Sequence, residues 1–288
     1  MTGHVSVLMK EVLENLDPKP GDVVLDATIN GGGHAKEILK KITPEGKLFG
    51  VEQDLEIIKK LRIENTELIN GNFRDLDKFD VDPLDAALFD LGMSSFQLEE
   101  SGRGFSFQKD EPLHMNFKIN LAPEDLTAKE ILNTWPKEDL FEILKEYGEE
   151  RNSKSISENI VKTRKMKKFK TTFDLVEVIR ESVPESYTKN RLNFATKTFQ
   201  ALRIAVNDEL NTLSEGMEKA WNLLKTDGRL VVISFHSLED RIVKNFMRSK
   251  KQEGLGIVLN KKPVEATKEE IKQNPRSRSA KLRVIVKK

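Results

Sequence analysis

Short apolar runs that end in a carboxylate are the feature of this sequence that most constrains its fold. Residues 23–25 are followed by Asp26, residues 47–51 by Glu52, and residues 86–89 by Asp90. Runs of this length are typical of buried strands, and strands that alternate with helical segments form a mostly parallel sheet covered by helices on both faces. We therefore predict an α/β fold. Further strands are expected at residues 230–235 and, as an antiparallel edge strand, at 282–286.

The interval between two of these strands predicts an inserted domain. Residues 91–228 amount to 138 positions, whereas a crossover connection with its helix needs only about 10–12. Patterns typical of capping boxes occur at Ser155-x-x-Glu158 and Thr171-x-x-Asp174. The interior of the interval has helical spacing at residues 126–132, 140–147, 156–166 and 173–179.

An apolar stripe follows these segments. It runs from Phe199 to Leu224 in steps of three and four residues. Such spacing predicts one helix of about 26 residues, roughly 40 Å long, that leaves the insert and returns along the sheet.

Composition excludes several classes of protein. The chain has no cysteine and four histidines, with neither an HxxxH nor an HExxH pattern, so disulfide frameworks and thiolate metal sites are excluded and no metal is expected. There is no apolar run of 18 residues and no signal-peptide pattern, which predicts a cytoplasmic protein without a membrane span. The net charge is +1, yet residues 151–170 carry +7 and residues 250–288 carry +8. These stretches are either nucleic-acid contacts or solvated helix faces.

A glycine cluster after the first strand indicates a cofactor site. Gly31-Gly32-Gly33-His34 precedes a helical segment, and glycines let a ligand approach the backbone and the helix N-terminus closely. Glu52 follows Gly33 by 19 residues and could accept the ribose hydroxyls of a nucleoside. The pattern GxxxxGK[ST] of a P-loop is absent, and the cluster departs from the GxGxxG of NAD sites. S-adenosylmethionine (SAM) fits best, with NAD and a glycine turn without ligand as alternatives.

Several long motifs resemble one family over nearly the whole chain. The chain is similar to the RsmH (MraW) family of bacterial small-subunit ribosomal RNA methyltransferases. The motifs are His4-Val5-Ser6-Val7-Leu8, Gly31-Gly32-Gly33-His34, Asp90-Leu91-Gly92-Met93-Ser94-Ser95, Arg103-Gly104-Phe105-Ser106-Phe107, Tyr147-Gly148-Glu149-Glu150-Arg151, Thr198-Phe199-Gln200-Ala201-Leu202-Arg203-Ile204, Ile233 to Lys244 and Asn274-Pro275-Arg276.

The resemblance implies a fold, a cofactor and a reaction. The fold is a Rossmann-like SAM-dependent methyltransferase core, residues 1–105 and 209–288, with a helical domain inserted at 106–208; residues 67–71 supply a weak third strand. The reaction is N4-methylation of a cytidine in the decoding region of the small-subunit (16S) ribosomal RNA, the partner is the small ribosomal subunit, and a homodimer is a further expectation. The residues that match SAM contacts in the family are Gly32, Gly33, His34, Glu52, Phe73, Asp90 and Gln97.

The substrate side of the site has its own candidates. Asp90 is the candidate acceptor for the cytidine amino group, although the resemblance also assigns it to the cofactor. The target base must leave its stack to be reached, so aromatic side chains near the cofactor are candidates for stacking. The candidate substrate contacts are Phe105, Phe107, His236, Arg276 and Arg278, each with a purely structural role as its alternative.

One departure from the family keeps alternative functions open. His114 stands where the family usually has an aspartate, and it would accept a hydrogen bond only when neutral. One alternative is a SAM-binding ribosome-assembly factor without catalysis. The other is a methyltransferase that acts on another nucleic-acid amine.

Overall fold

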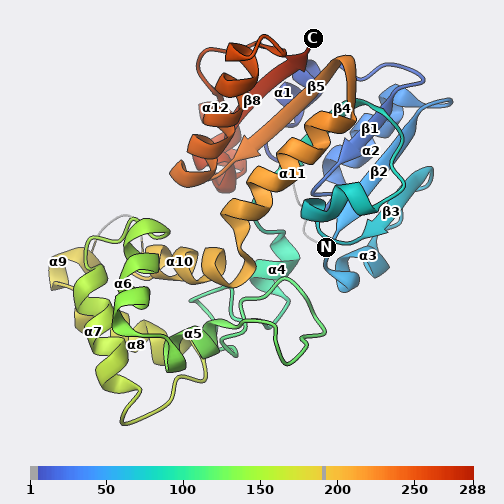
Figure 1. Cartoon of the computed structure of the whole chain (residues 1–288). Helices are drawn as coiled ribbons and strands as arrows, with labels where there is room; N and C mark the ends of the chain where they lie inside the picture. The colour runs from blue at the N-terminus through green and yellow to red at the C-terminus, as the bar shows by residue number, and fades with distance from the viewer. Residues whose placement is uncertain (1–5, 190–192) are drawn as a thin grey trace. The chain divides into compact units, whose positions relative to one another are not determined.

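The computed structural model describes residues 6–189 and 193–288, and the chain divides into two compact units (Figure 1). The first unit comprises residues 1–93 and 210–288, and the second comprises residues 94–209. The expected boundary at 105/106 falls inside the second unit, and the expected boundary at 208/209 lies one residue before its end. His4 and Val5 of the first family motif lie outside the described residues.

The first unit is built on one sheet in the order β3-β2-β1-β4-β5-β8-β6, with β7 also paired to β8. Strands β3 to β5 are parallel, and the order 3-2-1-4-5 is Rossmann-like, so the predicted fold is confirmed. The strands are β1 (Val23–Asp26), β2 (Lys47–Glu52), β3 (Thr66–Asn70), β4 (Leu84–Asp90), β5 (Leu224–Ser234), β6 (Gly256–Val258), β7 (Val264–Glu265) and β8 (Lys281–Lys287).

The expectation of an edge strand at residues 282–286 is wrong. Strand β8 is antiparallel, as expected, but it pairs with β5 on one side and with β6 and β7 on the other. Its burial agrees, since Leu282, Val284 and Ile285 are fully buried. The sequence did not reveal this position because β6 and β7 have only three and two residues, too few for a recognisable alternation.

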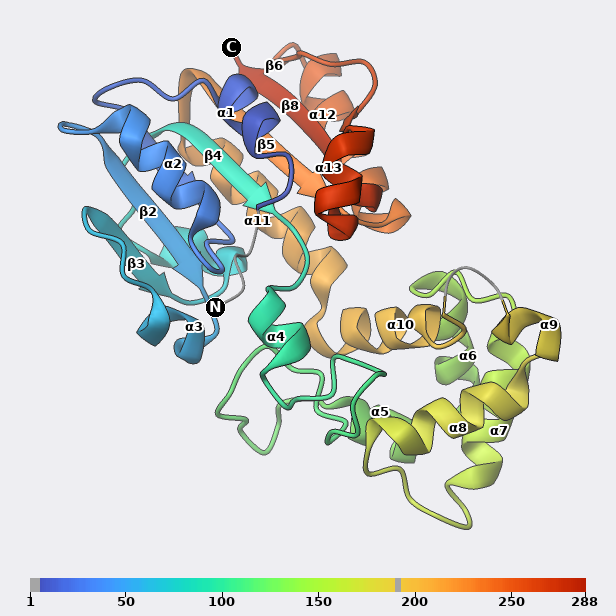
Figure 2. The ribbon, with the colours of Figure 1, turned by 180° about the vertical axis from the view of Figure 1, so that it is seen from behind.

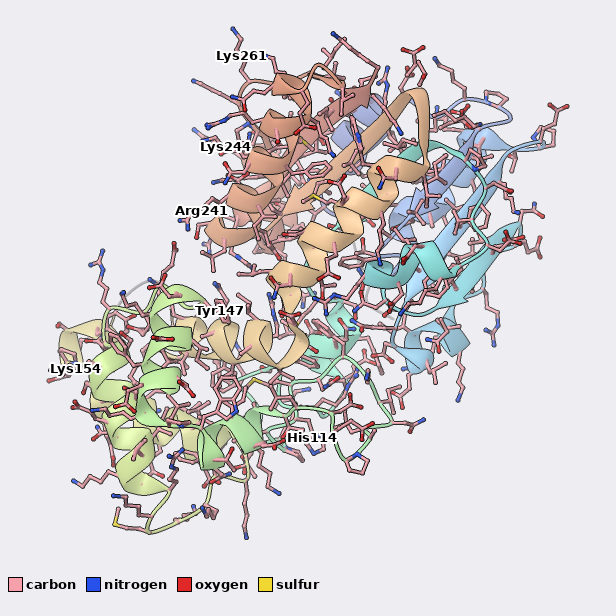
Figure 3. All side chains as sticks on the ribbon, viewed as in Figure 1. His114, Tyr147, Lys154, Arg241, Lys244 and Lys261 are labelled. Atoms are coloured by element: carbon pink, nitrogen blue, oxygen red, sulfur yellow. The ribbon has the colours of Figure 1, made fainter. Side chains whose placement is uncertain are left out.

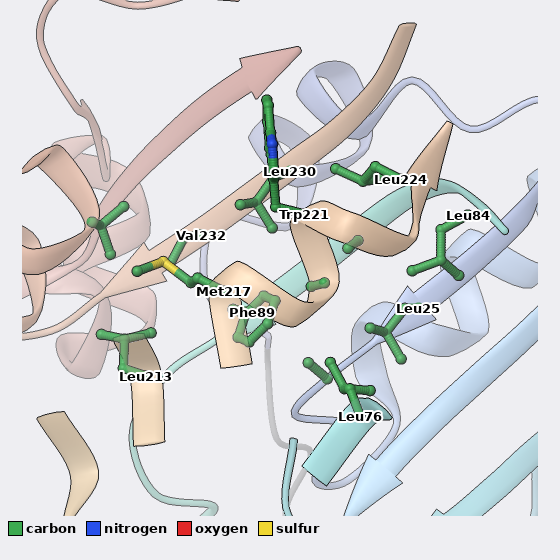
Figure 4. Packing of buried hydrophobic residues seen from close by; sticks show 14 of the residues in the cluster. Leu25, Leu76, Leu84, Phe89, Leu213, Met217, Trp221, Leu224, Leu230 and Val232 are labelled. Atoms are coloured by element: carbon green, nitrogen blue, oxygen red, sulfur yellow. The ribbon is translucent and has the colours of Figure 1, made fainter. Parts of the chain in front are cut away.

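Helices cover both faces of this sheet, as predicted (Figure 2). Figure 4 shows Met217 and Trp221 of α11 packed with Leu25, Phe89 and other strand residues in one buried cluster. The helices of this unit are α1 (Met9–Leu16), α2 (Gly33–Ile42), α3 (Leu55–Lys60), the 3-10 helix η1 (Phe73–Lys78), α11 (Glu209–Leu223), α12 (Ser237–Gln252), α13 (Lys268–Gln273) and the 3-10 helix η2 (Pro275–Ser279).

The second unit is helical. Thr171 forms the predicted capping box with Asp174. The one predicted at Ser155 is wrong, because α7 begins two residues earlier and the Ser155 hydroxyl donates instead to the carbonyl of Ser182, at 2.8 Å. The helices are α4 (Ser95–Glu99), α5 (Ala128–Thr134), α6 (Lys137–Glu146), α7 (Ser153–Thr163), α8 (Thr172–Ser182), α9 (Glu185–Thr188) and α10 (Thr196–Asn207).

The long helix expected from Phe199 to Leu224 is divided in two. Helix α10 ends at Asn207, and Asp208 adopts a left-handed conformation with φ 48° before α11 begins. The Asn207 side chain bonds outside its helix, donating to the carbonyl of Met115 and accepting from the amide of Phe117. The apolar spacing continues across the break, so periodicity alone did not reveal it. Within the described part of the chain, no helix is long and apolar enough to cross a bilayer.

Candidate functional site

Three acidic residues lie at the carboxyl ends of neighbouring strands of the first unit. Asp26 ends β1, Glu52 ends β2 and Asp90 ends β4, and β1 lies between the other two strands. The parallel register pairs Asp26 with Gly50 on one side and with Leu88 on the other. Asp26 and Glu52 are only 2% and 7% exposed. This is the edge at which open parallel sheets bind ligands.

The predicted glycine turn joins β1 to α2 at the same edge. Gly32 has a φ of +73°, a conformation that favours glycine, and a Cβ there would meet the Ile63 side chain at 2.2 Å. Helix α2 begins at Gly33 without a side-chain cap. Its first backbone N–H groups have no partner within the helix, so they are suited to a carboxylate or another anionic group.

His34 is buried at the start of α2 and joins two parts of the site. Its Nε2 lies 3.0 Å from the carbonyl oxygen of Val7, and its Nδ1 lies 3.4 Å from Oδ2 of Asp90. A carbonyl and a carboxylate both accept hydrogen bonds, so this arrangement suits an imidazole that carries a hydrogen on both nitrogens. Burial acts to lower the pKa of His34, but the hydrogen bond and charge of Asp90, together with Asp26, raise it overall. The contact with Asp90 therefore favours the protonated form of His34 more than an exposed histidine would.

Asp26 is the acid of this group that departs furthest from its ordinary behaviour. Burial raises the pKa of Asp26 to about 7, against the attraction of His34 and a hydrogen bond from the amide of Thr28. The negative charge of Asp90 adds to this rise. Near neutral pH, Asp26 therefore exchanges a proton inside the site.

Asp90 is held in place by its own strand and by the turn that follows β1. Its backbone amide donates to the Thr28 hydroxyl at 2.7 Å, and its Oδ2 faces His34. Its other carboxylate oxygen, Oδ1, is buried and has no hydrogen-bond partner among the residues that the structure describes. A buried acceptor without a partner is costly, so a donor on a bound ligand would stabilise it.

Glu52 and Phe73 lie on the β2 and β3 side of the edge. Oε1 of Glu52 accepts from the amide of Asp54 at 2.9 Å, which fixes the carboxylate at the turn into α3. Phe73 begins η1, directly after β3, and its ring packs edge-on against Phe89 with centroids 5.3 Å apart. The structure therefore brings together the carboxyl-edge residues predicted in this unit: Gly32, Gly33, His34, Glu52, Phe73 and Asp90.

Three of the predicted residues belong to the second unit. Gln97 is 4% exposed and forms a capping box with Ser94 at the start of α4. The ring of Phe105 is buried and stacks on Phe117. Phe107 is partly buried and packs edge-on against Phe199. The structure thus gives each of these side chains a partner inside its own unit.

His114 also lies in the second unit. It is partly buried, and burial, together with the positive charges of Lys129 and Arg103, lowers its pKa. His114 is therefore neutral at pH 7 and can accept a hydrogen bond there.

The remaining substrate candidates lie in the C-terminal part of the first unit. His236 follows β5 as the N-cap of α12, where it forms a capping box with Glu239. Arg276 and Arg278 lie in η2, and Arg278 is exposed. The capping contacts give His236 a structural role, while the exposed arginine is open to solvent and to an anionic partner.

No role was expected from the sequence for Asp26, Thr28 or the Val7 carbonyl. Asp26 carried a signal, because it ends its strand as Glu52 and Asp90 end theirs. The Val7 carbonyl had none, since its contact with His34 joins positions 27 residues apart through backbone chemistry that any residue type provides.

Comparison with known proteins shows the family of this chain. The model of the MraW methylase family matches residues 1–288. A "Ribosomal RNA small subunit methyltransferase H" of Clostridium botulinum (strain Kyoto / Type A2) is 42% identical, covering 99% of this chain and 98% of the relative. A protein of the same name from Dictyoglomus thermophilum is 46% identical, covering 98% of this chain and 95% of the relative. Another from Sulfurihydrogenibium azorense is 44% identical, covering 99% of both. The chain therefore belongs to the MraW methylase family.

Proposed function

We propose that this protein is a SAM-dependent methyltransferase that methylates N4 of a cytidine in small-subunit ribosomal RNA. Family membership over the whole chain and the names of its relatives support the reaction class and the substrate. The observation that carries the assignment to this site is Oδ1 of Asp90, a buried acceptor at the ligand-binding edge of the sheet to which no described residue donates.

The chemistry of the edge fits SAM. Glu52 offers carboxylate oxygens to ribose hydroxyls, and the first N–H groups of α2 suit the carboxylate of the methionine moiety. Phe73 offers an aromatic surface beside the Glu52 strand for adenine, and Gln97 is assigned from the family resemblance. When bound there, SAM supplies an activated methyl group.

Asp90 has two possible tasks in the reaction. Its Oδ1 would either accept a hydrogen bond from the amino group of the methionine moiety or hold the cytidine amino group and accept its proton. In both cases His34 positions the carboxylate, because its Nδ1 lies at Oδ2 and leaves Oδ1 to the ligand. Asp90→Asn separates the two tasks: a weaker SAM affinity marks the first, and a lower kcat at unchanged SAM affinity marks the second.

The RNA side of the proposal rests on the physical demands of the reaction. N4 of cytidine is reached only when the base leaves its stack, so the enzyme must hold an unstacked nucleotide. Phe105, Phe107 and His236 remain proposed contacts of the base, and Arg276 and Arg278 of phosphates. Ribosomal subunits mature in the bacterial cytoplasm, where we place the enzyme. The family resemblance also implies a homodimer, and light scattering measures the oligomeric state.

Methyl transfer to defined acceptors tests the function. Labelled SAM is incubated with small ribosomal subunits from cells that lack this protein, with naked small-subunit RNA, and with duplex DNA that contains cytosine. We expect N4-methylcytidine in the ribosomal RNA by nucleoside mass spectrometry, and none with the Asp90→Ala protein. Label in the DNA alone would favour a methyltransferase that acts on another nucleic-acid amine. Tight SAM binding without any methylation would favour a ribosome-assembly factor without catalysis.

A further inference from the structure

Helix α12 carries a row of exposed positive charges on one face. Arg241, Lys244, Arg248 and Lys251 recur at intervals of three, four and three residues, and all four are exposed. Figure 3 shows Arg241 and Lys244 on the same outer flank of the first unit, with the exposed Lys261 further along it. Residues three or four apart on a helix are neighbours, so the row is continuous over a rise of about 15 Å. We call it the α12 cationic face.

Three charges of this face, those of Lys244, Arg248 and Lys251, differ from the paired Lys250 on the same helix. Within the described ranges, no acidic side chain forms an ion pair with Lys244, Arg248 or Lys251. Lys250, on a different side of the same helix, pairs with Glu218 at 2.6 Å. Asp240, an acid close to the face, is engaged by Arg283 at 2.7 Å. The face therefore presents a net positive potential to solvent.

The opposite side of α12 faces the core of the first unit. Its apolar side chains, Val243 and Met247, are buried in the core cluster beneath the helix. The exposed face carries no apolar side chain between Arg241 and Lys251 that would enter a lipid layer. A row of regularly spaced cations along the exposed side matches a flexible polyanion that offers one charge after another.

The position of the helix relates the face to the proposed active site. Strand β5 pairs with β4 through Ile233 and Asp90 and ends at Ser234, and α12 starts three residues later at Ser237. The cationic face thus begins about one helical turn from the carboxyl edge and runs away from it.

We propose that the α12 cationic face binds the phosphates of single-stranded RNA next to the target nucleotide. The inference rests on the proposed function and adds a second, distinct surface to it. A base that reaches the carboxyl edge must be unstacked, so its neighbouring nucleotides are held by their backbone. Sequence-independent binding of this kind depends strongly on salt, because each neutralised phosphate releases counterions.

The salt dependence of RNA binding tests the proposal. The variant Lys244→Gln/Arg248→Gln/Lys251→Gln removes three charges from the face. The control Lys40→Gln/Lys41→Gln/Lys59→Gln removes three exposed charges from α2 and α3. Affinity for a labelled twelve-residue oligocytidylate is measured from 50 to 200 mM salt. Methyl transfer to small subunits and SAM affinity are measured in parallel.

We expect the slope of log affinity against log salt to become shallower by about 2 in the α12 variant, at roughly 0.7 per phosphate contact. Between 50 and 200 mM salt, the wild type would then lose about 20-fold more affinity than the variant. SAM affinity should be unchanged, and KM for the subunit should rise more than kcat falls. The control should behave as the wild type.

Two results would overturn the inference: an unchanged slope in the α12 variant, or an equal loss in the control. The proposed function fails differently, when the wild-type protein itself transfers no methyl group to ribosomal RNA. A wild type that methylates subunits, together with an unchanged slope, leaves the function standing and removes the α12 surface.

Discussion

Asp26→Asn should make the first unit more stable at neutral pH, and the gain should grow as the pH rises. The pKa of Asp26 is about 7 in the folded protein against an ordinary value of 3.8. Between these values the folded state binds the proton more tightly than the unfolded state, so the free energy of unfolding of the wild type falls as pH rises. Asparagine does not titrate, and its carbonyl oxygen can still accept the hydrogen bond from the Thr28 amide.

The size of the effect follows from these two pKa values. The full difference corresponds to about 4 kcal/mol above pH 7, of which about 2–3 kcal/mol develops between pH 5 and pH 8. Loss of the Asp26 charge also lowers the pKa of His34, so the folded variant holds the His34 proton less tightly as pH rises, which adds to the gain. We therefore expect the stability of the variant, relative to wild type, to rise by about 2–3 kcal/mol or more from pH 5 to pH 8.

Urea unfolding followed by tryptophan fluorescence measures this difference. The chain has two tryptophans, and in a Trp135→Phe background the signal comes from Trp221, which is buried in the core of the same unit as Asp26. Comparing the two pH values cancels any effect of the substitution that does not depend on pH. An equal stability difference at pH 5 and pH 8 would refute the reasoning, because it would mean that Asp26 titrates normally.

Three further substitutions test the site. Glu52→Gln should weaken SAM binding by about 1–3 kcal/mol in calorimetry while keeping the acceptor for Asp54; unchanged affinity would remove the ribose role. Gly32→Ala should lower the melting temperature more than Gly21→Ala. Both residues have a positive φ, but only at position 32 would the added Cβ meet the side chain of Ile63. Equal losses would mean that backbone strain is the sole cause. His34→Gln should be most destabilising below pH 6.5. The pKa of His34 is raised in the folded protein, so its contribution to the free energy of unfolding is lost as pH rises through that folded-state pKa. A loss of stability that does not depend on pH would contradict the ion pair with Asp90.

The sequence predicted the features of this fold that depend on local pattern. The parallel strands and the carboxylates that end them follow from runs of apolar residues, and the glycine turn follows from residue type. The break at Asp208 was missed because it is a single left-handed residue inside an unbroken apolar period. The inner position of β8 was missed because its partners β6 and β7 carry too few residues to signal a strand.

For the site, the sequence predicted which residues meet at the sheet edge but not the contacts and pKa values that they have there. Residues at strand ends and in the turn were found because topology alone brings them to one edge of the sheet. The proton held between His34 and Asp90, and the altered pKa of Asp26, depend on burial and on distances that only the folded chain defines. Such coupling leaves no trace in residue spacing.

The pairing of β4 with β5 has a consequence for synthesis on the ribosome. The two strands are separated by the whole of the second unit, yet they lie side by side in the sheet. At about 5–20 residues per second, β5 emerges on the order of 10 s after β4. During that delay the strand Leu84–Asp90, most of it apolar, has no neighbour on one side, and an unpaired apolar strand is a template for aggregation. A nascent chain of this protein is thus most vulnerable while its helical unit is being made, and rapid folding of that unit shortens the distance that β5 must travel to cover the strand.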